Sequence, residues 1–151
     1  MRLIGAKIGV LILCAGAHIV KADEAGEAAQ VYRRAVFQSM LWNFAPMGEM
    51  ARGKRDFDAA ETKRRALAVS YLSLLLDEAF PAGSGASAGT TDALDAIWQN
   101  PTDFSAKLNK LQAEANALRK IAALGDQASF VEQFKKVGAA CKACHDKYKA
   151  D

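Results

Sequence analysis

Two cysteines and a histidine form one compact motif near the C-terminal end of the chain, and this motif constrains the fold more than any other feature. Cys141, Cys144 and His145 spell C-x-x-C-H, the pattern typical of covalent attachment of a c-type haem. Residues three apart lie on nearly one face of a helix. Both thiols can therefore form thioethers along one edge of a porphyrin, and His145 can bind the iron. Because little chain follows the motif, we expect the haem pocket to be built from the residues before it.

Two other kinds of site use the same cysteine spacing. A structural zinc site needs four ligands, and the chain has no second cluster of cysteine and histidine. A thioredoxin-like redox pair lies next to a βαβ pattern, and strand-like alternation of apolar and polar residues is absent from the sequence. We therefore favour the haem interpretation and predict one covalently bound haem c as the cofactor.

The N-terminal segment has the pattern of a secretory signal peptide. A basic start is followed by an apolar run over 8–17 and by small residues before a predicted cleavage point between Ala22 and Asp23. The apolar run is too short to span a membrane. We predict that residues 1–22 are removed and that residues 23–151 form one domain. We place this domain in the periplasm without a membrane anchor, because c-type haem is attached outside the cytoplasm.

Removal of the signal peptide changes both the charge and the set of available ligands. Three of the 20 basic residues and none of the 17 acidic ones lie in residues 1–22, so cleavage lowers the formal net charge from +3 to 0. A neutral mature chain gives no reason to expect nucleic-acid binding. Cys14 and His18 are removed too, which leaves the motif with the only thiols and the only imidazole of the mature chain.

Apolar residues repeat at helical spacing through the mature chain, and they predict four amphipathic helices. The first helix runs from about 24 to 50, with a kink or an end at Pro46. The second opens at Asp58, in an approximate capping box with Glu61, and stops near Phe80. The apolar stripe of the second helix consists of Leu67, Tyr71, Leu74 and Leu75.

The second half of the mature chain holds the other two helices. A Gly/Ser-rich loop over 82–92 and a short segment around Trp98 lead to the third helix, which runs from 102 or 103 to about 125. The fourth helix begins at Asp126 or at Ser129, and its apolar stripe continues into the haem motif. Four helices with mostly short connections predict an all-α, antiparallel four-helix bundle. A haem on the last helix fills the space between the helices, so we expect the apoprotein to be poorly folded.

Several segments together resemble a known family. The motif lies in the strongest of them, residues 138–149; softer matches are Tyr32-Arg33, Phe57-Asp58 before Ala59-Ala60, and Ile97-Trp98. With these segments the chain resembles the class II cytochromes c, and within that class cytochrome c prime, over roughly residues 24–150. The resemblance implies a four-helix bundle that carries a pentacoordinate, high-spin haem with His145 as the single axial ligand.

The resemblance also implies roles for three residues outside the motif. Phe37, five positions after Tyr32, stands over the open face of the haem, where its phenyl ring cannot bind iron. Lys149 lies near the proximal face, and Arg33 matches a basic residue near a haem propionate, although it could equally face solvent. The alternative is the low-spin branch of the same class, with Met40 of the first helix as sixth ligand. Met40 also suits core packing, and we favour Phe37.

These features predict a haem protein that transfers single electrons, binds diatomic gases such as NO and CO, or does both. The alternative with Met40 is a low-spin protein that acts purely as an electron carrier. No distal histidine or arginine can be assigned, so we expect no enzymatic activity. The expected partners are redox proteins or the gases themselves, and neither nucleic acid nor a membrane. The resemblance further implies a homodimer through the first two helices.

Overall fold

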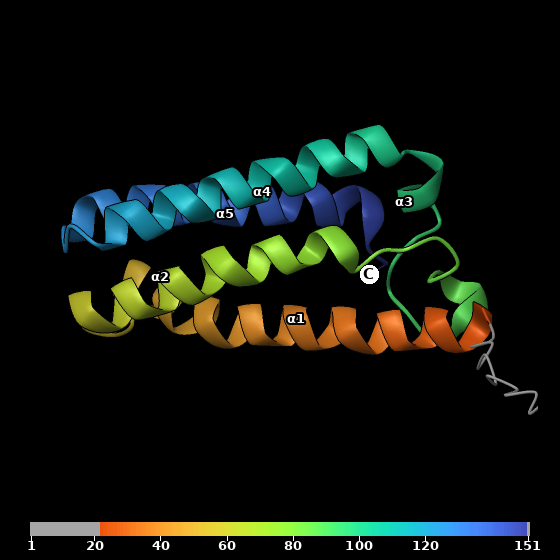
Figure 1. Ribbon diagram of the computed structural model, residues 1–151. Coiled ribbons are helices and arrows are strands. Elements are labelled where there is room, and N and C mark those ends of the chain that lie inside the picture. The colour runs from red at the N-terminus through yellow and green to blue at the C-terminus, as the bar shows by residue number, and fades with distance from the viewer. Residues whose placement is uncertain (1–21, 151) are drawn as a thin grey trace, which may run out of the picture.

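The computed structural model describes residues 22–150, and in this range the long elements are all α-helices. The predicted signal peptide, apart from Ala22, lies outside the described residues. The four long helices pack side by side in a bundle (Figure 1), which confirms the predicted fold class. They are α1 (Ala22–Ala51), α2 (Ala59–Leu74), α4 (Pro101–Ala122) and α5 (Gln127–Tyr148). The shorter elements are the 3-10 turns η1 (Leu75–Glu78) and η2 (Ala86–Ala88) and the single-turn helix α3 (Ala96–Gln99).

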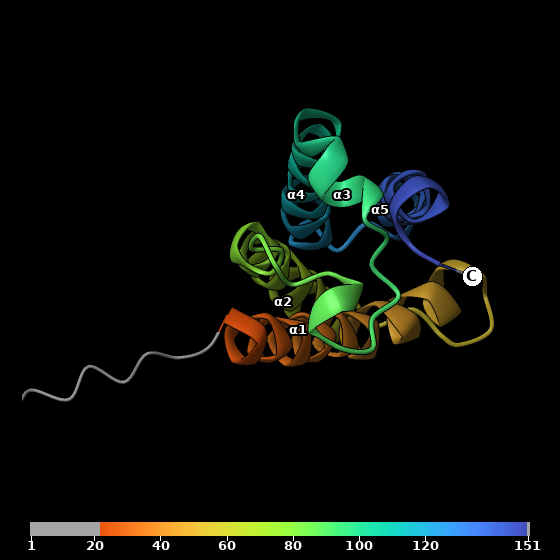
Figure 2. The same cartoon turned by 90° about the vertical axis from the view of Figure 1, so that its right-hand side faces the viewer.

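Successive long helices run in opposite directions, with α1 beside α2 and α4 beside α5 (Figure 2). The connection from α2 to α4 holds η1, η2 and α3, and it crosses the end of the bundle where α1 begins and α5 ends. The last turns of α5, which carry the motif, are therefore surrounded by α1, α4 and this long connection.

None of the helices within residues 22–150 combines the length and the apolar character needed to cross a membrane.

The helix ends follow local signals in the sequence. Asp58 caps α2 by accepting a hydrogen bond from the Glu61 backbone N–H (2.9 Å). Asp126 caps α5 in the same way, accepting from the backbone N–H of Ser129 (2.8 Å), so the structure selects Asp126 as the start of this helix. α4 begins at Pro101, slightly earlier than predicted, because a proline in the first helical position lacks only an N–H that would be unpaired anyway.

The end of α2 differs from the prediction, and its buried face is not its apolar stripe. The α-helix ends at Leu74, and helical geometry continues to Glu78 only as the tighter turn η1. The apolar stripe of this helix, which its spacing alone assigns neither to the core nor to an interface, is exposed. Small side chains form the buried face instead, because they let the neighbouring helices approach closely. The buried positions of α2 include Ala66, Val69, Ser70 and Ser73.

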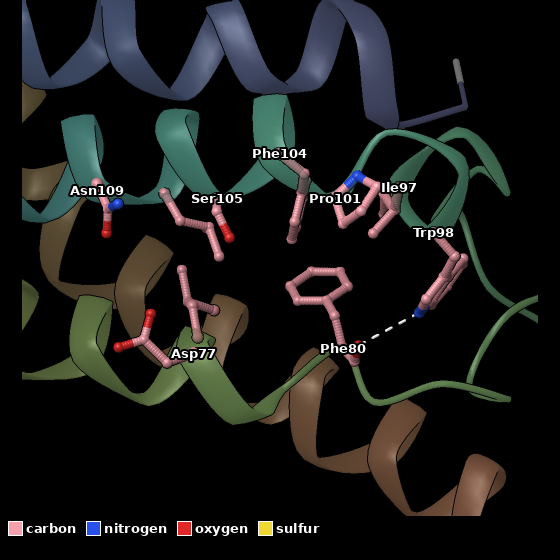
Figure 3. Close-up of a pocket in the computed structure, with 10 residues that line it drawn as sticks. Asp77, Phe80, Ile97, Trp98, Pro101, Phe104, Ser105 and Asn109 are labelled. Carbon is pink, nitrogen blue, oxygen red and sulfur yellow. Dashed lines mark hydrogen bonds between the residues drawn. The ribbon is translucent and has the colours of Figure 1, made fainter.

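A cleft of about 430 Å³ opens between η1, α3 and α4 (Figure 3). Its walls combine the rings of Phe80 and Phe104 with the polar side chains of Asp77, Ser105 and Asn109. Trp98 closes one side, where its indole N–H donates to the carbonyl of Phe80 (3.3 Å). Phe80 also belongs to the interior of the bundle, since its ring lies 6.4 Å from the ring of Phe37. The cleft thus reaches the side of the predicted site without containing any residue of the motif.

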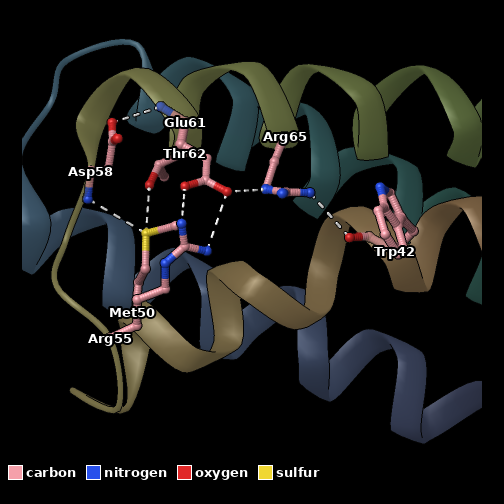
Figure 4. A network of polar contacts seen from close by, with 7 residues as sticks. All are labelled: Trp42, Met50, Arg55, Asp58, Glu61, Thr62 and Arg65. Carbon is pink, nitrogen blue, oxygen red and sulfur yellow. Dashed lines mark hydrogen bonds and ion pairs between the residues drawn. The ribbon is translucent and has the colours of Figure 1, made fainter.

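Pro46 does not end α1, which continues past it for more than a turn. A proline has no N–H, so the carbonyl of Trp42, four residues earlier, loses its partner within the helix. Nη1 of Arg65, on α2, donates to that carbonyl instead (3.1 Å; Figure 4). The Nε atom of Arg65 bonds to Glu61 (2.7 Å), and Arg55 pairs with the same carboxylate. This ionic network therefore compensates for the proline and joins α1 to α2.

Candidate haem site

The motif occupies the last turns of α5, with Cys141 and Cys144 on the side that packs against the core and His145 exposed beside them. The thiols of Cys141 and Cys144 are free and half-buried, and both pack against the hydrophobic core. Burial raises the pKa of each thiol. Burial of part of the ring, together with the positive charge of Lys149, lowers the pKa of His145. The imidazole is therefore neutral near pH 7, and only the neutral form has a lone pair to give to a metal.

Phe37, on α1, stands opposite His145. The two ring centroids lie 6.5 Å apart with an angle of 66° between the planes. Phe80 supports the phenyl ring from the side, at 6.4 Å and 69°. The structure thus brings together Phe37 and His145, the two residues that the family resemblance implies for the two faces of the haem, from two helices far apart in the chain.

Arg33 lies one turn before Phe37, and its side chain is only 4% exposed. The alternative that it faces solvent is therefore wrong. Its guanidinium donates four hydrogen bonds to the connection between α2 and α4, and burial lowers its pKa. None of the ion pairs among residues 22–150 includes it. The acceptors are all uncharged: the carbonyl of Ala79 (3.2 Å), the carbonyl and hydroxyl of Ser84 (3.0 and 3.3 Å) and the hydroxyl of Thr91 (2.8 Å).

The methionines of α1 are all buried. Met40, one turn after Phe37, belongs to the hydrophobic core, as does Met47. The sulfur of Met50 accepts hydrogen bonds from the backbone N–H of Asp58 (3.5 Å) and from the hydroxyl of Thr62 (3.4 Å). Met50 is therefore engaged at the far end of α1, and Met40 remains the methionine nearest to Phe37 in the chain.

Sequence reasoning missed two aromatic residues that hold the site together. The ring of Phe80 contacts the ring of Phe104 (4.8 Å), and Phe104 in turn contacts Tyr148 (5.2 Å). The guanidinium of Arg33 also lies over the Phe80 ring, 4.8 Å from its centroid. The sequence signal that could have found them is their position. Phe80 lies where the predicted second helix stops, and Phe104 lies near the start of the third, so both are next to the long connection.

The comparisons with known proteins agree with this geometry. A model of the family described as Cytochrome C' matches residues 28–149. The chain belongs to the cytochrome c' family. This family is known for haem-based binding of gases and for electron transfer, and its cofactor is a c-type haem.

Individual cytochromes c' resemble the chain over most of their length. The cytochrome c' of Rubrivivax gelatinosus is 35% identical over 124 residues, which cover 82% of this chain and 95% of that protein. The solved structure of cytochrome c prime from Shewanella frigidimarina matches with 42% identity and a TM-score of 0.80, and it covers 83% of this chain and 97% of that one. A nitric oxide complex of a variant from Alcaligenes xylosoxidans matches with 32% identity and a TM-score of 0.76, covering 83% of this chain and 97% of that one.

The side chains at the end of α5 fit the haem that cytochromes c' carry. Cys141 and Cys144 present two free thiols on one helix, and His145 presents a neutral imidazole beside them. A haem also brings two carboxylates into the protein. Arg33 is a buried cation with only uncharged partners among the described residues, and burial of a charge is costly until an opposite charge pairs with it. The donor set therefore matches the thioether, axial and propionate positions of a c-type haem.

Proposed function

We propose that this protein is a periplasmic cytochrome c' that binds diatomic gases such as NO and CO, transfers single electrons, or does both. Cys141 and Cys144 hold one haem c through thioethers, and His145 is its axial ligand. The observation that carries this proposal is the approach of the Phe37 ring to the His145 ring, 6.5 Å between centroids, beside two free thiols. We propose no enzymatic role, because Phe37, the residue proposed for the open face, has no group that could give or take a proton.

The haem, when bound, supplies an iron that changes its charge by one electron and that can take a small ligand. Phe37 has no atom that can bind the iron, so it leaves the sixth position open and covers it with an apolar ring. A small, nearly uncharged gas tolerates such a surface, whereas a ligand that needs a hydrogen-bond donor gains nothing there. The nitric oxide complex of the Alcaligenes xylosoxidans relative supports this preference.

Two basic residues complete the proposed site. Arg33 is buried beside the long connection, where its guanidinium can pair with a propionate. Lys149 lies just beyond α5, where its charge adds to the effect of burial in lowering the pKa of His145, so that the imidazole is available as a ligand. These roles follow the resemblance residue by residue, and the burial of Arg33 and the charge of Lys149 support them.

The surface of α1 and α2 supports a homodimer. Large apolar side chains are exposed on both helices, and such a surface on a small domain usually marks an interface. A second copy of the chain is the proposed partner of this surface, and redox proteins or gases are the partners of the haem. The exposed apolar residues of the two helices are Val31, Leu41, Trp42, Leu67, Tyr71 and Leu74, and Leu75 follows at the start of η1.

Absorption spectra of the purified holoprotein test this proposal. We expect a broad high-spin ferrous spectrum that changes on addition of NO, and a haem that stays on the chain after denaturation. Sharp, split low-spin bands in the ferrous protein contradict the open position and support Met40 as sixth ligand. In that case Met40→Leu converts the spectrum to high spin, whereas under our proposal this substitution leaves the spectrum unchanged. Haem that is released on denaturation contradicts the thioethers.

A further inference from the structure

The start of α4 lies beside the end of α5, and one carboxylate joins them. Asp103, in the first turn of α4, accepts a hydrogen bond from the hydroxyl of Tyr148 (2.6 Å). The same oxygen of Asp103 accepts from the ammonium of Lys147 (2.9 Å). Tyr148 is buried, and its ring packs edge-on against Phe104 (5.2 Å). Asp103 thus holds two consecutive residues that follow His145 within one turn.

The backbone of the same turn is held from a second direction. The N–H of Leu94 donates to the carbonyl of Tyr148 (3.0 Å), and the N–H of Ala150 donates to the carbonyl of Asp92 (2.8 Å). Between these two bonds, Ala93 and Lys149 form an antiparallel bridge. The last carbonyls of a helix lack partners within the helix, and helix ends fray for that reason. Here the final turn of α5 is clamped by α4 on one side and by the long connection on the other.

The charges at this junction suit the two helix dipoles. The N-terminal end of a helix carries a partial positive charge and its C-terminal end a partial negative charge. Asp103 lies at the N-terminal end of α4, and Lys147 lies at the C-terminal end of α5. Each charge therefore stabilises its own helix end as well as the ion pair between them. Lys107 lies 3.9 Å from the other carboxylate oxygen of Asp103, one turn further along α4.

We infer that Asp103 is a positioning residue for His145: it fixes the last turn of α5, and with it the direction of the imidazole. This inference rests on the proposed function, in which His145 is the axial ligand. An axial bond depends on the orientation of the ligand ring, which outer contacts of the ligand's own segment set. Tyr148 and Lys147 carry the restraint, because they lie three and two residues after His145 on the same turn.

The test compares four variants of the holoprotein by the iron–histidine stretching band in the resonance Raman spectrum of the ferrous state. Asp103→Ala removes the acceptor of both bonds, and we expect the band to broaden and shift. Tyr148→Phe keeps the ring against Phe104 but loses the hydroxyl, so we expect a similar change. Asp103→Asn retains an oxygen that accepts from Tyr148, and we expect it to restore the band of the unmodified protein.

Glu132→Gln is the matched control. Glu132 pairs with Lys135 (2.7 Å) on the exposed side of α5, more than three turns before His145. Its substitution breaks an ion pair of the same helix, and we expect an unchanged band. If Asp103→Ala does not fold, Tyr148→Phe and Asp103→Asn decide the question by themselves.

The spectra distinguish failure of the proposed function from failure of the role inferred for Asp103. An unmodified protein without an iron–histidine band contradicts the proposed function itself. An unmodified protein with that band, together with the same band in Asp103→Ala and Tyr148→Phe, overturns the role of Asp103 alone. The second result holds even if these variants melt at a lower temperature, because a merely structural contact changes the melting temperature without changing the axial bond.

Discussion

The ring of Phe37, on α1, stands edge-on to the ring of His145, on α5, with 6.5 Å between the centroids. In the proposed site this places a side chain without any donor atom over the open position of the iron. The size of that side chain then sets the barrier that an incoming gas must cross. Access to the iron is therefore a property of one residue, and substitution at that residue tests it.

We expect Phe37→Ala to raise the rate of CO association with the ferrous protein by about tenfold, which corresponds to about 1.4 kcal/mol of activation free energy. Stopped-flow absorption measures this rate. Phe44→Ala is the control, because Phe44 is an aromatic residue of the same helix that stacks on Phe134 (4.2 Å) instead of facing His145. An unchanged rate in Phe37→Ala, or an equal change in Phe44→Ala, contradicts the proposed covering role.

Arg33 and Arg34 are adjacent in sequence but differ sharply in environment. Arg33 is buried and donates four hydrogen bonds to the connection between α2 and α4, whereas Arg34 is exposed and donates one, to the carbonyl of Thr90 (3.2 Å). We expect Arg33→Ala to lower the free energy of unfolding by about 2–4 kcal/mol, since hydrogen bonds from charged donors contribute about 1.5–3 kcal/mol each and partly compensate one another. Urea denaturation of the holoprotein measures the change.

Arg34→Ala serves as the matched control, with an expected change within about 0.5 kcal/mol. Arg33→Met adds a second comparison, because its side chain keeps apolar bulk against Phe80 but loses every hydrogen bond. Equal stabilities of the Arg33→Ala and Arg34→Ala variants contradict the anchoring role of Arg33.

Most of the fold was predictable because its signals are local. The caps at Asp58 and Asp126, the haem motif and the helical spacing each depend on residues within a few turns of one another. The buried face of α2 was not predictable in this way. The exposed row containing Leu67 and Tyr71 has the same period as the buried row that contains Ala66, and spacing alone does not say which row faces the core. Close helix packing reverses the usual preference for large residues inside.

The residues of the candidate site likewise fall into two groups, those visible in the sequence and those brought together only by the fold. Cys141, Cys144 and His145 are contiguous, so their joint chemistry is visible in the sequence. Asp103 and Phe80 come close to the motif only because α4 lies antiparallel to α5 and because the long connection crosses the end of the bundle. The burial of Arg33 has the same origin, since its acceptors lie on that connection. Contacts of this kind require the tertiary structure.

Acid is expected to destabilise the protein through Glu61, the carboxylate that joins Arg55 and Arg65. A hydrogen bond from Arg65, assisted by the charges of both arginines, lowers the pKa of Glu61 from its ordinary value of 4.5. The folded state therefore holds this proton less tightly than the unfolded state. The stabilisation is complete above about pH 4.5 and is lost as the pH falls toward the lower, folded-state pKa.

Urea denaturation between pH 3 and 7 checks this dependence. We expect Glu61→Gln to be less stable than the unmodified protein at neutral pH and to lose less stability on acidification. Glu49, an exposed glutamate of α1, supplies the control, and Glu49→Gln is expected to follow the unmodified protein. Parallel acid profiles for the unmodified protein and Glu61→Gln contradict a role for this carboxylate.

The exposed apolar surface of α1 and α2 predicts where a homodimer forms. Trp42 is 77% exposed and Tyr71 is 62% exposed, on two neighbouring helices. Buried aromatic anchors at interfaces typically contribute about 2 kcal/mol or more, so we expect Trp42→Glu to weaken dimerisation by roughly 30-fold or more. Because the Trp42 carbonyl keeps its bond to Arg65, the fold of the monomer is preserved.

Leu124→Glu is the control, since Leu124 is 75% exposed but lies in the turn between α4 and α5. Analytical ultracentrifugation compares the three proteins, and a dimer that Trp42→Glu leaves intact while Leu124→Glu dissociates it would place the interface at the turn between α4 and α5 instead.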